Sequence, residues 1–140
     1  MIEWGSKYEL GIAKVDGQHR VLVMLINRLE SLRDSGAASD RDLDEILKHL
    51  DQYVRTHFAD EERMLNQLGY EGNEEHLAEH RAFEERIVEL RAEFESGQTD
   101  VLNQLSEFLG GWLTHHILES DRSYVDEFRA RDLLKQAASL

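Results

Sequence analysis

The chain contains no cysteine and no proline. The absence of cysteine excludes disulfide frameworks, cysteine-ligated zinc, iron–sulfur clusters, thiol nucleophiles and covalently attached c-type haem. The absence of proline means that no predicted helix is broken by a residue without a backbone N–H. The chemistry of the chain must therefore use other side chains.

Basic residues and long apolar runs are also scarce. Lys and Arg number 16 against 29 Asp and Glu, which gives a formal net charge of −13. An acidic surface repels the phosphates of nucleic acids and of anionic membranes, so neither is an expected partner. No apolar run approaches the roughly 18 residues of a membrane span, and the start of the sequence lacks the apolar core of a signal peptide. We therefore expect a cytoplasmic protein.

Three glycine-containing breaks, near residues 36–39, 69–72 and 97–99, divide the sequence into four helical segments. The predicted helices cover residues 16–35, 40–68, 74–96 and 100–119, with Asp16, Ser39 and Asn73 as caps. An arm, 1–15, precedes them. A helix-prone segment, 120–140, follows, and the sequence leaves open whether it continues the fourth helix. Short connections favour antiparallel neighbours. The sequence thus predicts an all-α protein, with one domain over 1–140. Its expected architecture is an up-down-up-down four-helix bundle with an N-terminal arm and a C-terminal helical extension.

Ionisable residues interrupt the apolar stripes of all four predicted helices. Six fall in line with Leu, Ile and Phe residues: His19, His57, Glu61, His76, His80 and His116. A single histidine in such a position is usually a hydrogen-bonded core residue, but a dry core does not easily satisfy five imidazoles and a carboxylate without a cation. All six also fall at the same end of an up-down-up-down bundle. We therefore predict a metal site, and we expect His49 and His115 at the surface.

The spacing supports this prediction. His57 and Glu61 are four residues apart, as are His76 and His80, so each pair points one way on a helix. Imidazole and carboxylate without thiolate make iron and zinc the leading metals. The Glu-x-x-His pairs of ferritin-like di-iron enzymes are absent. Residues 76–80 match the His-x-x-Glu-His motif of a zinc protease, but Glu79 points about 100° away from His80 on a helix, which weakens that alternative.

Further motifs follow one another along most of the chain. In order they are Trp4, Tyr8, Gly11-Ile12, Asp16-x-Gln18-His19, His57-Phe58-x-x-Glu61-Glu62, Met64, Gly69-Tyr70, His76-x-x-Glu79-His80, Phe83, Trp112-Leu113-x-x-His116-Ile117, Asp121 and Tyr124. Together they resemble the bacterial hemerythrins. Residues 125–140 extend beyond this pattern.

The resemblance implies a non-haem di-iron centre that binds O2 reversibly, in a protein that is not an enzyme. One iron is implied to be held by His76, His80 and His116, and the other by His19 and His57. The bridges are implied to be Glu61, Asp121 and an oxo or hydroxo group. In two six-coordinate irons this ligand set leaves one position open, on the iron with two histidines, where O2 would bind.

The role of Asp121 as a metal ligand rests on the resemblance alone. It follows His116 by five residues, which is about 140° round a regular α-helix. If both residues face the metal, the helix must widen or break between them. A π-type turn is one way to achieve this.

Reversible binding also requires a dry pocket, because water and protons promote oxidation of the metal. The expected walls, which fit ordinary core packing equally well, are Leu22, Ile26, Trp112, Leu113 and Ile117. Gln18, Glu62 and Asp60 are candidates for hydrogen bonds to the outer imidazole nitrogens, with a plain surface position as the alternative.

Four functions fit these observations to different degrees. The first is oxygen carriage, storage or delivery. The second is an O2 or redox sensor in which residues 120–140 relay a change at the iron to a signalling partner, and the same segment offers a surface to an oxygen-receiving partner. The third is a di-iron enzyme acting on peroxide or nitric oxide. The fourth is a haem-binding bundle with two histidine ligands, which leaves three stripe histidines unexplained.

Overall fold

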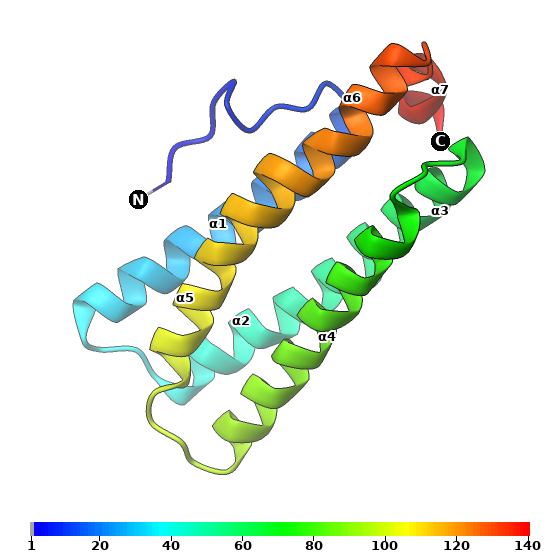
Figure 1. The fold of residues 1–140 in the computed structure, drawn as a ribbon. Helices are drawn as coiled ribbons and strands as arrows, with labels where there is room; N and C mark the ends of the chain where they lie inside the picture. Colours follow the sequence, from blue (N-terminus) through cyan, green and yellow to red (C-terminus); the bar gives the residue numbers. More distant parts are fainter. Residues whose placement is uncertain (1) are drawn as a thin grey trace.

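The computed structural model describes residues 2–140 and confirms an all-α bundle. Four helical rods run up-down-up-down, and short connections join them (Figure 1). In chain order the helices are α1 (Ala13–Ser35), α2 (Asp40–Tyr53), the π-helix η1 (Val54–Phe58), α3 (Ala59–Leu68), α4 (Asn73–Glu95), α5 (Val101–Trp112), the π-helix η2 (Leu113–Asp121), α6 (Arg122–Ala130) and α7 (Leu134–Ser139). The second rod consists of α2, η1 and α3, and the fourth of α5, η2 and α6.

The helix starts follow local hydrogen bonding. Ser39 caps α2 as predicted, because its side chain accepts a bond from the Asp42 N–H while the Asp42 carboxylate accepts one from the Ser39 N–H. The cap predicted at Asp16 was wrong, because α1 begins earlier, and that carboxylate instead accepts bonds from the backbone of Leu10 (2.8 Å) and Gly11 (3.2 Å). Asp16 thus fastens the N-terminal arm to the bundle.

One further predicted boundary was wrong, because Asn73 is the first residue of α4 rather than its cap. The sequence left open whether the segment after residue 119 continues the fourth helix. It does continue, through η2 into α6, and Tyr124, Val125 and Phe128 are fully buried on this continuation. The chain turns near Asp132, where φ is 57°, and α7 lies at that end of the bundle (Figure 1).

The apolar interior forms two clusters along the bundle axis. The larger one contains Leu22, Ile26, Phe58 and Ile117, and the smaller one contains residues such as Met64 and Tyr124 near the carboxyl end of α3 and on α6. The polar stripe residues come between these clusters on several rods: on α1, for example, His19 lies between Val15 of the small cluster and Leu22 of the large one. The small cluster therefore covers the end of the bundle at which the polar residues gather.

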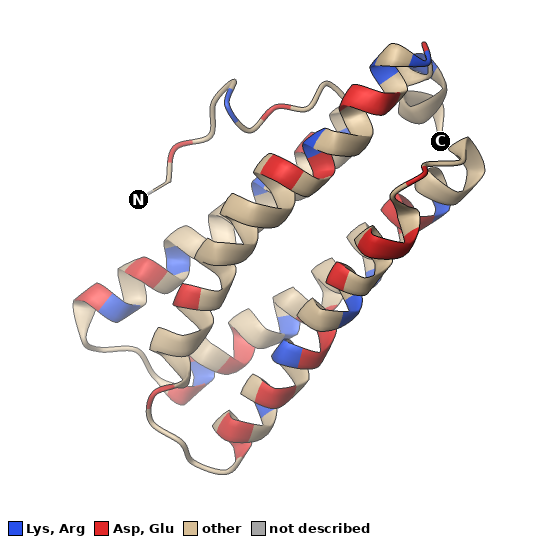
Figure 2. Cartoon of the chain, in the orientation of Figure 1, with Lys and Arg blue, Asp and Glu red and all other residues tan. Residues whose placement is uncertain are grey.

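The outer faces of the helices are charged. Figure 2 shows Asp and Glu residues interspersed with Lys and Arg along the long rods. Exposed pairs one turn apart, such as Asp44 with Lys48 (2.9 Å) and Asp51 with Arg55 (3.0 Å), contribute little stability because water screens them. None of the helices in the described part of the chain is both long and apolar enough to cross a membrane.

Candidate metal centre

The structure brings the six polar stripe residues and Asp121 together inside the bundle. They are arranged in two groups of donors, each with its atoms within 4.8 Å of one another. The first group is Glu61, His76, His80 and His116, and the second is His19, His57, Glu61 and Asp121. All seven side chains are buried, and Glu61 belongs to both groups.

The two carboxylates lie between the groups. Oε1 of Glu61 is 2.6 Å from Nε2 of His76, while Oε2 is 3.5 Å from Nε2 of His57. Oδ1 of Asp121 is 3.0 Å from Nε2 of His116, while Oδ2 is 3.0 Å from Nε2 of His19. Each carboxylate thus directs one oxygen at each group, which is the disposition of a carboxylate that bridges two cations.

The π-helix η2 explains how Asp121 reaches the cluster. A π-turn has hydrogen bonds from residue i to i+5, so residues five apart fall nearly one above the other. His116 and Asp121 have this spacing, lie within Leu113–Asp121 and are both buried. The helix is therefore widened between the two residues, which is one of the two outcomes expected if both face the metal. A second π-helix, η1, carries His57.

The donor set fits a cation. Among the described residues, both ring nitrogens of His19, Nε2 of His57, Nε2 of His116 and both oxygens of Asp121 are buried without a hydrogen bond of suitable geometry. Leaving buried polar atoms unpaired costs about 1–3 kcal/mol each. A metal ion bound to these nitrogens and oxygens removes that cost, and imidazole with carboxylate suits iron or zinc.

Three of the imidazoles are oriented by an outer hydrogen bond. Nδ1 of His57 donates to Gln18 Oε1 (2.5 Å), and Nδ1 of His80 donates to Glu62 Oε2 (3.1 Å). Nδ1 of His116 donates to Glu79 Oε2 (2.5 Å). Each bond places the proton on Nδ1 and turns Nε2 toward the cluster as a ligand atom.

The surface alternative for Gln18 and Glu62 was therefore wrong, since both contact ring nitrogens. Asp60 lies one step further out, where it accepts a bond from Gln18 Nε2 at 2.9 Å. Sequence reasoning missed Glu79 in this role. Its carboxylate faces η2, where it also accepts a bond from Ser120 (2.9 Å), and that position does not suit a general base at the cluster.

The imidazoles of the metal-free cluster differ in their protonation. Burial lowers the pKa of His57 to about 3, so this imidazole is neutral and its Nε2 lone pair is free. Burial also acts to lower the pKa of His76, but the carboxylates of Asp121 and Glu61, 3.0 and 2.6 Å from its Nε2, outweigh burial and raise the pKa to about 9. Burial and Glu61 act to raise the pKa of Asp121, but the charge of His116, whose Nε2 is 3.0 Å away, keeps it well below its usual range. Protons on imidazole thus balance the buried carboxylates until a cation replaces them.

Aromatic rings enclose the ligands. The Phe58 ring stacks on His80 at 3.8 Å, and the Trp112 ring stacks on His116 at 4.0 Å. Tyr53 stacks on His57 at 5.0 Å, and burial, with the charges of Asp121 and Glu61, raises the pKa of its hydroxyl well above the usual value. Tyr53 therefore keeps its proton.

The remaining predicted residues are placed as follows. The expected pocket walls Leu22, Ile26, Leu113 and Ile117 are buried in the large apolar cluster, and Trp112 packs against it from a half-buried position. His49 and His115 are exposed, as predicted. His115 instead pairs with Glu119 at 3.0 Å on the surface.

Comparison with known proteins agrees with this geometry. The family model described as the Hemerythrin HHE cation binding domain matches residues 10–128. A bacteriohemerythrin of Stenotrophomonas maltophilia is 31% identical over 132 residues, which cover 93% of this chain and 83% of the relative. A bacteriohemerythrin of Clostridium acetobutylicum is 32% identical over 129 residues, which cover 90% of this chain and 100% of the relative. A hemerythrin-like protein of Naegleria gruberi is 28% identical over 121 residues, 86% of this chain and 88% of the relative. The chain belongs to the hemerythrin family.

Proposed function

We propose that the protein holds two iron ions and binds O2 reversibly, as a carrier, store or delivery protein rather than as an enzyme. In this proposal His76, His80 and His116 hold one iron, and His19 and His57 hold the other. Glu61 and Asp121 bridge the two. When bound, a pair of redox-active irons supplies the electrons on which O2 binding draws.

One observation carries the proposal: two buried donor groups share Glu61, and the oxygens of Asp121 are divided between them. A single metal ion does not account for both groups. A haem with two histidine ligands leaves three buried imidazoles unused, and a zinc protease leaves the second group without a role.

The two groups also differ in the number of imidazoles. The group that contains Asp121 has two imidazoles, His19 and His57, whereas the other group has three. Because two imidazoles fill fewer coordination positions than three, the ion held by His19 and His57 has room for an external ligand. Leu22, Ile26, Leu113 and Ile117 are the apolar walls that we propose to exclude water from this ligand, and Trp112 covers His116.

Metal analysis and O2 difference spectra test the proposal. We expect two irons per chain and a visible absorption band that forms when O2 is added to the reduced protein and disappears when O2 is removed. One zinc per chain, or a haem spectrum, would refute the metal assignment. A band that decays within seconds to the oxidised protein would refute stable carriage.

A sensing role is the second candidate, because α6 continues without a break from Asp121 and its Tyr124 hydroxyl donates to Glu61 Oε2. Hydrogen exchange of residues 122–140 in the reduced protein, with and without O2, separates the two functions. A sensor shows different protection in the two states, whereas a simple carrier shows the same protection.

A further inference from the structure

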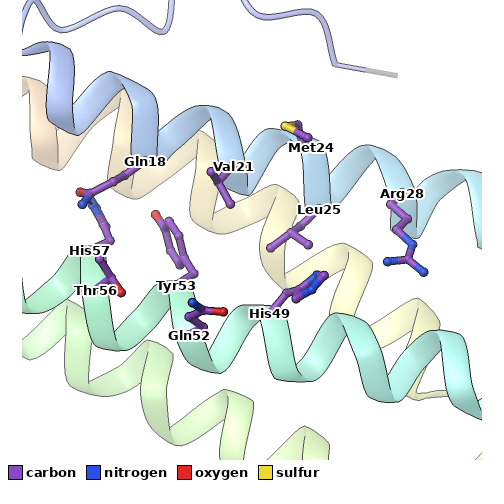
Figure 3. A pocket seen from close by; sticks show the side chains of 10 residues that line it. All are labelled: Gln18, Val21, Met24, Leu25, Arg28, His49, Gln52, Tyr53, Thr56 and His57. Carbon is purple, nitrogen blue, oxygen red and sulfur yellow. Dashed lines mark hydrogen bonds between the residues drawn. The ribbon is translucent and has the colours of Figure 1, made fainter.

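A groove of about 510 Å³ lies between α1 and α2, on the side of the bundle next to the donor group with two imidazoles. Figure 3 shows its lining side chains, which come from α1 and from the α2–η1 rod. They are Gln18, Val21, Met24, Leu25, Arg28, His49, Gln52, Tyr53, Thr56 and His57. The groove therefore leads from the surface to one of the proposed iron ligands, His57.

The mouth of the groove is unusually apolar for this acidic chain. Val21 is 46% exposed and Met24 is 69% exposed, and they are two of four large hydrophobic side chains exposed in the described part of the chain. The cation at the rim, Arg28, is already engaged by Glu45 at 3.1 Å. The groove thus offers apolar contact and no free positive charge, which suits a neutral ligand better than an anion.

The lining of the groove includes a hydrogen-bond donor that has no partner in the described part of the chain. The Tyr53 hydroxyl is buried and has no hydrogen-bond partner among the described residues. Its ring stacks on His57, with an interplanar angle of 21°. A buried hydroxyl without a partner is costly, and a bound ligand that accepts its hydrogen bond removes that cost.

We propose that this groove is the route by which a neutral diatomic gas reaches the metal centre, and that the Tyr53 hydroxyl donates a hydrogen bond to the gas once it is bound. The inference rests on the proposed function for the presence of iron. It adds an entry site and a residue that holds the ligand. Nitric oxide is the probe, because it is a neutral diatomic that binds reduced iron whether or not O2 binding proves reversible.

The route is tested by blocking the mouth of the groove with a bulky group. Since the chain has no cysteine, V21C introduces a single thiol at the mouth, which a methanethiosulfonate reagent converts to a bulky benzyl adduct or a small methyl adduct. The control is V88C with the same adducts, because Val88 is 68% exposed and lies on α4. Stopped-flow mixing of the reduced, iron-loaded proteins with nitric oxide gives the association and dissociation rate constants.

We expect the benzyl adduct at position 21 to slow both rate constants by about tenfold or more with little change in their ratio, which is the behaviour of an obstructed route. The methyl adduct and both adducts at position 88 should stay within about twofold of the unmodified protein. If the benzyl adduct at position 21 changes neither constant, the groove is not the route. Iron that fails to bind nitric oxide also overturns the inference, while failure of O2 binding alone overturns only the proposed function.

The hydroxyl is tested separately by Tyr53→Phe, which keeps the ring against His57. Loss of one neutral hydrogen bond should raise the dissociation rate constant about two- to tenfold and leave the association rate constant unchanged. We expect the N–O stretching frequency of the bound nitric oxide to shift on deuterium exchange in the parent protein. In Tyr53→Phe the frequency itself should differ, and the shift on deuterium exchange should be absent. Thr56→Val, which also removes a hydroxyl from the lining, is the control. Unchanged dissociation and an unchanged vibrational spectrum in Tyr53→Phe would show that the hydroxyl does not contact the ligand.

Discussion

The Tyr124 hydroxyl donates a 3.0 Å hydrogen bond to Oε2 of Glu61, the carboxylate that both donor groups share. Tyr124 lies on α6, beyond the predicted end of the fourth helix, and it is fully buried. The carboxyl-terminal part of the rod is therefore attached directly to the cluster of donor residues.

Tyr124→Phe should weaken this attachment. The variant keeps the ring but removes one donor from a buried carboxylate, so we expect a loss of about 1–3 kcal/mol in the free energy of unfolding. Iron should also be removed faster by a chelator. Thermal unfolding and chelator competition measure the two effects. Tyr8→Phe, in the half-buried arm, is the control and should change neither. Wild-type stability in Tyr124→Phe would show that the hydrogen bond adds nothing.

The ligand assignment predicts opposite results for two histidines. His80→Ala removes a buried donor of the three-imidazole group, so the purified protein should lose at least one of the two proposed irons. His49→Ala, at an exposed position, should keep the full iron content. Elemental analysis after identical purification provides the comparison. Equal iron loss in both variants would remove the basis for the assignment.

Glu79→Gln tests an outer residue that contacts a proposed ligand. The charged acceptor on Nδ1 of His116 becomes a neutral one, which makes the imidazole a poorer ligand, so metal affinity should fall about 10- to 100-fold. Competition with a coloured chelator measures the affinity. Glu119→Gln is the matched control, because Glu119 pairs with the exposed His115. Equal affinities in the two variants would contradict an orienting role for Glu79.

Much of this arrangement could be predicted from the sequence. Five histidines and Glu61 fall on apolar stripes with helical periodicity, and that pattern does not depend on neighbouring helices. Asp121 could not be found in this way, because periodicity assumes an α-helix and η2 is a π-helix. The resemblance supplied Asp121, and the mismatch of angle predicted the widening of the helix.

The outer contacts were harder to predict. Glu79 reaches His116 across a helix interface, and no spacing within one helix reveals such a contact. Tyr53 did carry a signal, since it precedes His57 by four residues and so shares its face of the helix. The continuation into α6 stayed open at the level of the sequence, because no glycine or capping pattern after residue 119 decides between one long helix and two.

The α7 helix should protect the metal centre. A small space of about 10 Å³ lies against it, lined by residues that include Glu61, Met64, Ala137 and Leu140. Ending the chain at Asp132 removes the apolar cover, so water should reach the cluster and the O2-bound protein should oxidise faster. Stability should fall by about 1–3 kcal/mol through lost burial. The oxidation rate in air measures the effect, and Lys135→Ala, an exposed change on α7, is the control. An unchanged oxidation rate in the shortened chain would mean that α7 does not seal the centre.

Finally, the pKa of His76 predicts a pH dependence that metal should abolish. In the metal-free protein this pKa is raised from 6.5 to about 9, and that of His116 is also raised, since hydrogen bonds and charges of the carboxylates outweigh burial. A pKa that is higher in the folded state stabilises the fold fully below the unfolded value and loses that effect as the pH rises through the folded value. The metal-free protein should therefore unfold at progressively lower temperature as the pH is raised from about 6.5 to 9. The iron-loaded protein should show no such decline, because its ligand imidazoles carry no exchangeable proton on the metal-binding nitrogen.

Thermal midpoints of both forms across this pH range measure the difference. Metal-free His76→Ala should show a shallower decline than the metal-free parent. An equal decline in the parent and in His76→Ala would show that protonation of this imidazole does not stabilise the fold.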